Sequence, residues 1–470
     1  MGERMVDILP EISYSNLYAI RGKERIMMHI QLSDHFTYGK LFRFTIPSIG
    51  MMIFTSIYGI VDGIFVSNYV GKTAFAALNL IMPFIMIFGA LGFMLGTGGC
   101  ALISKTMGEG KKDKANEIFT ELILVSVILG AVLTVVGCAV VRPVAVFLGA
   151  EGQMVTDCVV YGRLLLSTLI CFLLQNEFQS FCVAAERPRM GLWITVAAGV
   201  TNIALDAVFV GVFRWGLAGA GAATAISQLV GGMIPLVYFL APNPTVLRLR
   251  KFRFDAKALL RSCTNGSSEL VSNLSLSLVN MLFNFQLLRF AGEDGVAAYG
   301  VIMYVNFIFV GVFLGYSFGA APVISFHYGA GNREELRGLF RKSLGLMSFF
   351  ALVLTAAAEL LSGVLSGVFV GYDPTLYALT CRGFRIYALS FLFMGFNMFG
   401  SAFFTALNDG LISALISFLR AFLFQVGAIL VLPALWGVDG VWMAVVAAEL
   451  LAIAVTAVCF VKKRKAYEYF

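Results

Sequence analysis

The feature that most constrains this chain is a series of apolar runs, each about 20 residues or longer. In lipid every backbone polar group must be satisfied internally, and a helix of about 20 apolar residues crosses the roughly 30 Å hydrocarbon core. The chain is 59% hydrophobic and 13% charged, against about 25% charged in soluble domains. We therefore expect an all-α, multi-pass protein of the inner or plasma membrane. The predicted spans are 42–67, 75–101, 117–141, 159–184, 190–213, 217–240, 264–290, 296–324, 343–370, 383–405, 411–433 and 437–461.

The basic residues predict the orientation. Twelve crossings place both termini on one side, and 26 of the 34 Lys and Arg residues lie in the loops and termini of that side. Cytoplasmic loops carry an excess of Lys and Arg. Both termini are therefore expected in the cytoplasm, and the net charge of +7 reflects topology rather than nucleic acid binding.

The second half of the chain repeats the first. A constant offset of 221 residues, without a gap from Ala76 to Leu229, aligns Ile103-Ser104 with Ile324-Ser325, Gly108 with Gly329 and Trp215-Gly216 with Trp436-Gly437. Parallel repeats of this kind place two similar bundles around an axis along the membrane normal. We expect two pseudo-symmetric six-helix bundles.

This repeat divides the chain into five parts. The N-terminal segment lacks the features of a signal peptide and is expected either to form a short amphipathic helix on the membrane surface or to be disordered. The predicted parts are a cytoplasmic segment (1–40), an N-lobe (41–241), a cytoplasmic linker (242–261), a C-lobe (262–461) and a basic tail (462–470).

An acidic residue lies deep in the fifth span. Asp206 is within the apolar run 192–213, where an ionised carboxylate costs about 2.5 to 3.5 kcal/mol on insertion scales. Asn202 is four residues earlier and so lies on the same helix face. The pair could converge on a proton, a cation or a water-filled cavity. The alternative is a protonated Asp206 that only packs against a neighbouring helix.

The repeat separates these two interpretations. If the intramembrane polar groups only helped a six-helix bundle to pack, the second half would need them too, yet each maps to an apolar residue or glycine. Two nearby carboxylates disfavour double ionisation, so they would share a proton or a monovalent cation, and neutral side-chain oxygens suit a hard cation such as Na⁺. The mapped pairs are Asp62 with Phe283, Asn202 with Leu423, Asp206 with Gly427 and Thr224 with Val445.

Other intramembrane polar residues leave two interpretations open. Glu177 follows Asn176 in the fourth span and either lines a substrate cavity with it or makes a structural hydrogen bond. Glu269, with Asn273 four residues later, either contacts a cation or substrate in the second lobe or is an interfacial residue.

Arg420 lies far from any helix end and needs an acidic partner, for which Glu449 on the last span is the candidate. The chain has no Walker A sequence, no CxxC and no cluster of catalytic or metal-ligating groups. An enzyme is therefore not expected, and transport would draw its energy from an ion gradient.

The order of these motifs resembles the multidrug and toxic compound extrusion (MATE) transporters, particularly their bacterial branch. The resemblance lies in Pro47 and Asp62 on the first helix, Asn202-x-x-x-Asp206 on the fifth, Thr224 within Gly219-Ala-Gly-Ala-Ala-Thr on the sixth, and Leu174-Gln175-Asn176 ahead of Ala184-Ala185-Glu186-Arg187-Pro188. It implies a V-shaped pair of bundles, with Asp62, Asn202, Asp206 and Thr224 matching the N-lobe cation site and Pro47 the bending first helix.

Together these observations predict a secondary active antiporter that exports organic, often cationic, compounds in exchange for Na⁺ or H⁺. It would need no cofactor other than the coupling ion and would act as a monomer on small organic substrates in the bilayer. The alternative is a lipid or lipid-linked sugar flippase of the same superfamily. A channel or a membrane-bound enzyme is a more distant possibility.

Overall fold

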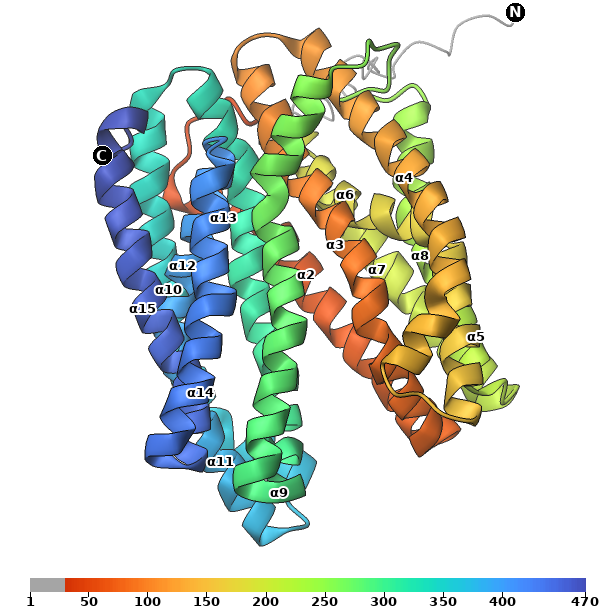
Figure 1. Ribbon diagram of the computed structural model, residues 1–470. Helices are drawn as coiled ribbons and strands as arrows, with labels where there is room; N and C mark the ends of the chain where they lie inside the picture. Colours follow the sequence, from red (N-terminus) through yellow and green to blue (C-terminus); the bar gives the residue numbers. More distant parts are fainter. Residues whose placement is uncertain (1–29) are drawn as a thin grey trace, which may run out of the picture.

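The structure, a computed structural model, describes residues 30–470, and all regular elements in this part of the chain are helical (Figure 1). The predicted all-α fold is thus confirmed.

The N-lobe consists of α2 (Tyr38–Phe65), η1 (Val66–Val70), α3 (Lys72–Gly108), α4 (Lys112–Phe147), α5 (Gln153–Ser167), α6 (Leu169–Ala184), α7 (Pro188–Asp206), η2 (Ala207–Val212) and α8 (Gly216–Leu240). The C-lobe consists of α9 (Ala256–Gly329), α10 (Arg333–Val370), α11 (Pro374–Ala388), α12 (Phe391–Ala406), α13 (Gly410–Phe418), η3 (Leu419–Phe424), α14 (Gln425–Trp436) and α15 (Val438–Tyr467). The η elements are π-helical.

The twelve predicted crossings are present, although three of them differ from simple helices. Within residues 30–470, nine helices are long and apolar enough to span a membrane, and two bent pairs raise this number to eleven. The bends are 58° between α5 and α6 and 47° between α11 and α12. The 74-residue α9 holds two predicted spans, because Gly292 has non-helical backbone with φ 65° and divides it. Counting α9 as two spans brings the number from eleven to twelve.

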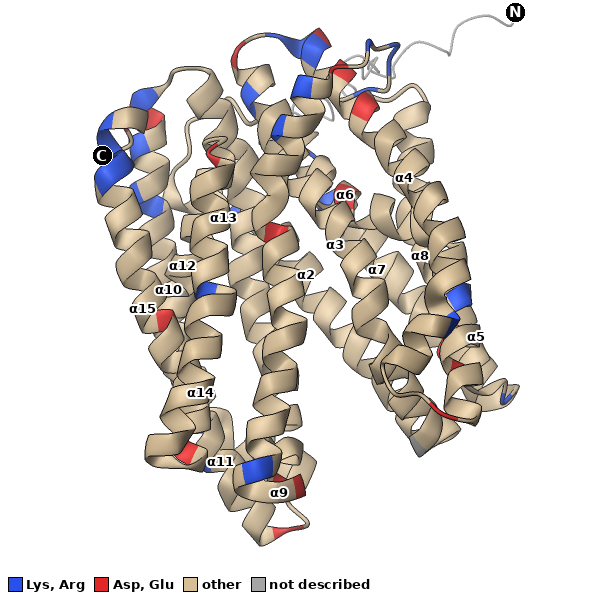
Figure 2. Ribbon diagram, in the orientation of Figure 1, with Lys and Arg blue, Asp and Glu red and all other residues tan. Residues whose placement is uncertain are grey.

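The two lobes are closest at the end that carries the start of α2 and the C-terminus, and they diverge toward the opposite end (Figure 1). Lys and Arg residues gather at the closed end, and few charged residues lie along the middle of the helices (Figure 2). Large apolar side chains such as Leu360 and Val368 on α10 are exposed, as expected for a surface that faces lipid. The fold is therefore a two-lobe, multi-pass membrane protein.

Glycines allow α3 and α9 to touch backbone to backbone at the closed end. A methyl group at Gly108 would strike the carbonyl oxygen of Phe326, and one at Gly329 would strike that of Lys105. Gly108 and Gly329 are equivalent under the 221-residue offset, so the same contact is made twice, once from each lobe. Small residues permit this close approach between membrane helices.

A second set of close contacts obeys the same symmetry. A methyl group at Gly98 in α3 would lie 2.9 Å from the Cα of Gly266 in α9. The repeat partners of these two residues, Gly319 and Thr45, also meet, because a methyl group at Gly319 would lie 3.1 Å from the Cα of Thr45. Two helices of the N-lobe, α2 and α3, thus both contact α9 of the C-lobe.

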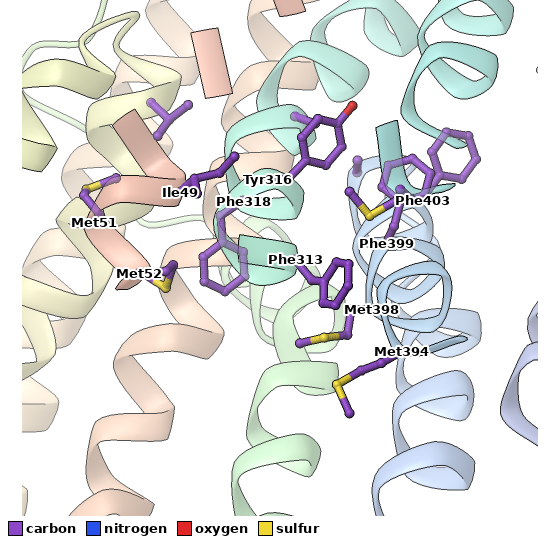
Figure 3. Packing of buried hydrophobic residues seen from close by; sticks show 14 of the residues in the cluster. Ile49, Met51, Met52, Phe313, Tyr316, Phe318, Met394, Met398, Phe399 and Phe403 are labelled. Carbon is purple, nitrogen blue, oxygen red and sulfur yellow. The ribbon is translucent and has the colours of Figure 1, made fainter. Parts of the chain in front are cut away.

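An apolar seam continues from these contacts into the C-lobe. Figure 3 shows Ile49 and Met52 of α2 beside Phe318 of α9, and Phe313 of α9 beside Met398 of α12. All five residues belong to one buried hydrophobic cluster that includes residues of both lobes. The lobes therefore share a core at the closed end.

A short segment before α2 bonds to both lobes at the closed end. Leu32 donates its backbone N–H to Glu186 of the N-lobe at 2.8 Å, and Phe36 donates its N–H to Glu335 of the C-lobe at 2.9 Å. Lys342 Nζ also donates to the Phe36 carbonyl, and the Phe36 side chain is fully buried. We call residues 30–37 the bridging segment. The amphipathic helix considered for the N-terminus falls mostly on residues 1–29, outside the described part.

The glycine contact predicts a steric effect on stability. Gly329→Ala should lower the free energy of unfolding by about 1–3 kcal/mol, because the methyl group overpacks a backbone contact. Thermal unfolding of the purified protein in detergent measures this. Gly300→Ala on the same helix is the control, since nothing lies within 4 Å of its added methyl group. Equal unfolding temperatures for the two variants would contradict the packing argument.

The bridging segment predicts a local effect on amide exchange. Glu335→Ala removes the acceptor of the Phe36 N–H, a hydrogen bond to a charged group, so hydrogen exchange in residues 30–37 should accelerate about tenfold or more. Glu334→Ala removes the exposed neighbouring carboxylate and should leave the exchange rate of residues 30–37 unchanged. The measurement is hydrogen–deuterium exchange with mass spectrometry. Unaltered exchange in Glu335→Ala would show that the bond does not hold the segment.

Candidate functional site

Asp62 and Asp206 come together inside the N-lobe. Asp62 is on α2, four residues before η1, and Asp206 is the last residue of α7, directly before η2. The two carboxyl groups are near enough to interact electrostatically. π-helical segments are frequent at functional sites, and here two of them begin within one turn of the two carboxylates.

Three of the four carboxyl oxygens of this pair lack protein partners in the described part of the chain. Within residues 30–470, Asp62 Oδ1 and both oxygens of Asp206 are buried and make no hydrogen bond of regular geometry. The Asp206 side chain is fully buried. An isolated buried carboxylate is strongly disfavoured unless it is neutralised. The pair is therefore suited to hold a proton or a small cation.

Asn202 and Thr224 lie beside each other in the same lobe. Asn202 is one helical turn before Asp206 and donates from Nδ2 to Thr224 Oγ1 on α8 at 3.3 Å. This leaves the Asn202 carbonyl oxygen free to coordinate a cation. The four residues singled out from the sequence thus lie on three helices, α2, α7 and α8, within one lobe.

Tyr161 connects the two parts of this cluster and was missed in the sequence. It is fully buried on α5 and its hydroxyl donates to Met82 Sδ at 3.9 Å. It also lies near enough to Thr224, Asp62 and Asp206 to interact with them electrostatically. Tyr58, one turn before Asp62, likewise interacts with that carboxylate. The repeat comparison could have found both tyrosines, since under the same offset they map to Arg382 and Val279.

Pro47 is buried within α2, which continues through it as one helix. A proline inside a helix removes one backbone hydrogen bond and weakens the helix at that point. The position therefore fits a place where α2 can change shape, and its bending stays a prediction.

Asn176 and Glu177 lie inside the N-lobe, away from the cavity described below. Asn176 Nδ2 donates to the Gly89 carbonyl at 3.2 Å, and Glu177 accepts a short hydrogen bond from Ser126. Both side chains are buried. These contacts do not support the expectation that the two residues line the substrate cavity, because each faces a neighbouring helix of its own lobe.

Glu269 and Asn273 do line a cavity, which lies in the C-lobe and has a volume of about 210 Å³. Eight of its 26 lining residues are aromatic or methionine, and eleven are polar or charged. The aromatic and methionine residues are Phe283, Tyr299, Met303, Phe307, Phe318, Tyr387, Met394 and Met398. Flexible methionines and aromatic rings suit apolar ligands of varied shape.

A buried ion pair forms part of the same cavity wall. Arg420 Nε donates to Glu449 at 2.8 Å to Oε1 and 3.0 Å to Oε2, which confirms the predicted pairing. Asn397 Nδ2 also donates to Glu449 Oε2, at 2.8 Å, and Thr456 donates to Asn397 Oδ1 at 3.0 Å. The Glu449 carboxylate is therefore fully held by protein groups, in contrast to Asp62 and Asp206.

Comparison with known sequences supports one family. A sequence model of the MatE family matches residues 47–208 and 270–430, one segment in each lobe. The multidrug export protein MepA of Staphylococcus saprophyticus is 21% identical over 423 residues, which cover 88% of this chain and 91% of that protein. MepA of Staphylococcus aureus strain MSSA476 is 22% identical over 427 residues, with the same coverage.

Solved structures agree with the fold. A MATE protein in complex with MaL6 superposes with a TM-score of 0.89 at 23% identity, over 94% of this chain and 100% of that chain. The outward-facing conformation of a multidrug resistance MATE family transporter gives a TM-score of 0.88 at 23% identity, over 94% and 99%. Since the family match covers most of both lobes, the chain belongs to the MatE family, the multidrug and toxic compound extrusion transporters of the membrane.

Proposed function

We propose that this protein is a secondary active antiporter that exports organic cations in exchange for Na⁺ or H⁺. The observation that carries this proposal is the carboxylate pair Asp62 and Asp206. Three of its four oxygens are buried without a hydrogen-bond partner among residues 30–470, and the pair occurs in one lobe only. The names of the MepA relatives, multidrug export proteins, support the export of varied compounds.

The orientation follows from the charge distribution. Lys and Arg gather at the end where the lobes meet (Figure 2), and basic residues favour the cytoplasm. We therefore assign both termini and the closed end to the cytoplasm of the cell. In this orientation the lobes open outward, so that an external ion could enter and a substrate could leave.

The chemistry of the cycle depends on charge neutralisation. An external Na⁺ or H⁺ neutralises the Asp62 and Asp206 pair, and the Asn202 oxygen and the Thr224 hydroxyl are placed to complete the coordination of Na⁺. The loss of negative charge changes the packing of α2 around Pro47, substrate leaves, and the ion is released inward after the lobes rock. One charge that moves through 100 mV provides about 2.3 kcal/mol, enough for about fifty-fold accumulation.

One lobe of one chain supplies every residue of this ion site, which supports a monomer as the working unit. The cycle needs no cofactor. The substrate enters from the bilayer or the cytoplasm and crosses between the lobes, where the glycine contacts at the closed end can separate.

The proposal predicts coupling to an ion gradient. In proteoliposomes loaded with ethidium as the organic cation, a sodium gradient or a pH gradient, imposed separately, should drive efflux of the dye, and collapse of the effective gradient with an ionophore should stop it. Fluorescence of the dye follows the transport. Efflux that is equal with and without either gradient would contradict antiport.

The carboxylate pair predicts the effect of removing charge alone. Asp62→Asn and Asp206→Asn keep the size of each side chain but cannot bind a proton or compensate a cation, so gradient-driven efflux should fall to the level of empty liposomes. Asp157→Asn, a carboxylate of the same lobe on α5, should retain transport. Retention of wild-type efflux by either of the first two variants, with equal amounts of inserted protein, would exclude that residue from the coupling mechanism.

A further inference from the structure

The segment that joins the two lobes carries an excess of basic residues. Residues 247–261, which we call the basic strap, contain six Lys and Arg residues but a single acidic residue, Asp255. All six basic residues are exposed, and the strap lies at the closed end, where Lys and Arg residues gather (Figure 2). It therefore presents a concentrated positive surface. The six residues are Arg248, Arg250, Lys251, Arg253, Lys257 and Arg261.

Hydrogen bonds to α4 fix the first half of the strap on the N-lobe. Arg248 donates its backbone N–H to Asn116 Oδ1 at 2.7 Å, and Arg250 donates its N–H to Thr120 Oγ1 at 3.0 Å. Two residues of extended chain advance about 6.6 Å, close to the roughly 6 Å rise of four helical residues. Amides two residues apart in the strap can therefore reach acceptors four residues apart on α4, and the strap has a defined position.

The ion pairs of this region leave most of the strap's charge unbalanced. Arg250 pairs with Asp113 of α4. Asp255, the one acidic residue of the strap, pairs with Lys114 of α4 at 3.0 Å. Within residues 30–470, the other five basic residues of the strap make no ion pair. Five positive charges are thus exposed without an acidic protein partner.

Two large apolar side chains are exposed among these charges. Phe254 is 66% exposed and Leu260 is 64% exposed. Leu260 lies on the same face of the first turns of α9 as Lys257, because residues three apart on a helix are neighbours. Exposed apolar side chains beside Lys and Arg are typical of segments that lie in a membrane interface. An excess of basic residues that served orientation alone would not need them.

The strap borders the part of α4 that faces lipid. Asn116, Thr120, Leu124 and Ile128 follow one another at intervals of four residues and so lie along one face of α4. The first two accept hydrogen bonds from the strap, whereas Leu124 is 45% exposed and Ile128 is 55% exposed, as expected for contact with lipid tails. The strap therefore lies at the level where the hydrocarbon region ends and the headgroups begin.

We propose that the basic strap docks on anionic phospholipid headgroups of the leaflet at the closed end. Its Lys and Arg side chains bind the lipid phosphates, and Phe254 and Leu260 enter the interface. Clusters of four to eight Lys and Arg residues directly beside a membrane helix attract anionic lipids, and a zwitterionic headgroup offers these residues no net charge. The proposal does not depend on ion coupling, since docking needs no gradient.

The test compares two lipids with the same acyl chains. Phosphatidylglycerol or phosphatidylcholine is titrated into the purified full-length protein in detergent, and native mass spectrometry measures the lipid-bound fraction. Phosphatidylglycerol should bind at least about tenfold more tightly, because only its headgroup carries a net negative charge. Equal affinities would overturn the proposal. Inorganic phosphate at the same concentration should not displace phosphatidylglycerol, and displacement would show that the strap binds free anions rather than lipid.

Two matched variants locate the site. The strap variant should bind phosphatidylglycerol at least about tenfold more weakly, with binding of phosphatidylcholine unchanged. The control variant removes four exposed basic residues of the C-lobe at the same end and should keep most of the affinity, since equal net charge is removed elsewhere. The strap variant combines Lys251→Gln, Arg253→Gln, Lys257→Gln and Arg261→Gln. The control combines Arg341→Gln, Lys462→Gln, Arg464→Gln and Lys465→Gln.

A further pair of variants tests the apolar contact and keeps every charge. Phe254→Asn should weaken binding of phosphatidylglycerol about threefold or more, because it removes an interfacial anchor. Leu411→Asn is the control, since Leu411 is an 80% exposed apolar residue at the start of α13, and it should leave binding unchanged. Equal losses in a strap variant and its control, or no loss in either strap variant, would overturn the strap as the docking site. If the fourfold strap variant does not fold, Phe254→Asn against Leu411→Asn decides the question.

Discussion

The whole arrangement depends on the close contact of α3 with α9 at the closed end, where Gly108 and Gly329 let the two helix backbones touch. Between helices in a membrane the hydrophobic effect provides little attraction, because lipid tails are as apolar as leucine, so close van der Waals packing must hold the lobes together. Gly108 and Gly329 provide it in a symmetric way. At these two glycines the contact has no interlocking side chains, whereas the neighbouring apolar seam of Ile49, Met52 and Phe318 must repack when the lobes separate.

On this common frame the two lobes treat buried charge in opposite ways. Within residues 30–470, three of the four carboxyl oxygens of Asp62 and Asp206 are buried without a hydrogen bond, whereas in the C-lobe Arg420 and Asn397 hold Glu449. In the proposed cycle the carboxylate pair responds to the external ion, because a proton or a cation neutralises it. The Glu449 carboxylate, which Arg420 already neutralises, does not respond in this way. Ion coupling can therefore be a task of the N-lobe alone, although both lobes share one fold.

The sequence predicted the parts of this picture that depend on length and pattern. Apolar runs of span length gave the twelve crossings, and the gap between the seventh and eighth spans contains Gly292, where α9 breaks. The same runs could not give the 58° bend between α5 and α6, because both arms are equally apolar. The repeat comparison selected Asp62, Asn202, Asp206 and Thr224, but not their proximity, which depends on how α2, α7 and α8 pack.

Two of the predicted cavity residues show that burial has two possible causes. Asn176 and Glu177 are as polar and as deep in their span as a cavity residue would be, yet their partners Gly89 and Ser126 belong to neighbouring helices. A polar residue in a membrane helix must find a partner, and only the packing decides whether that partner is protein or ligand.

The bridging segment shows the same limit outside the membrane. Its two bonds to Glu186 and Glu335 join the lobes, and at about 1.5–3 kcal/mol for each bond to a charged group they are of the same order as the energy of one charge in a 100 mV potential. In the proposed cycle, a closed end held by bonds of this strength favours the outward-open form at rest and releases when the coupled ion changes the charge of the N-lobe.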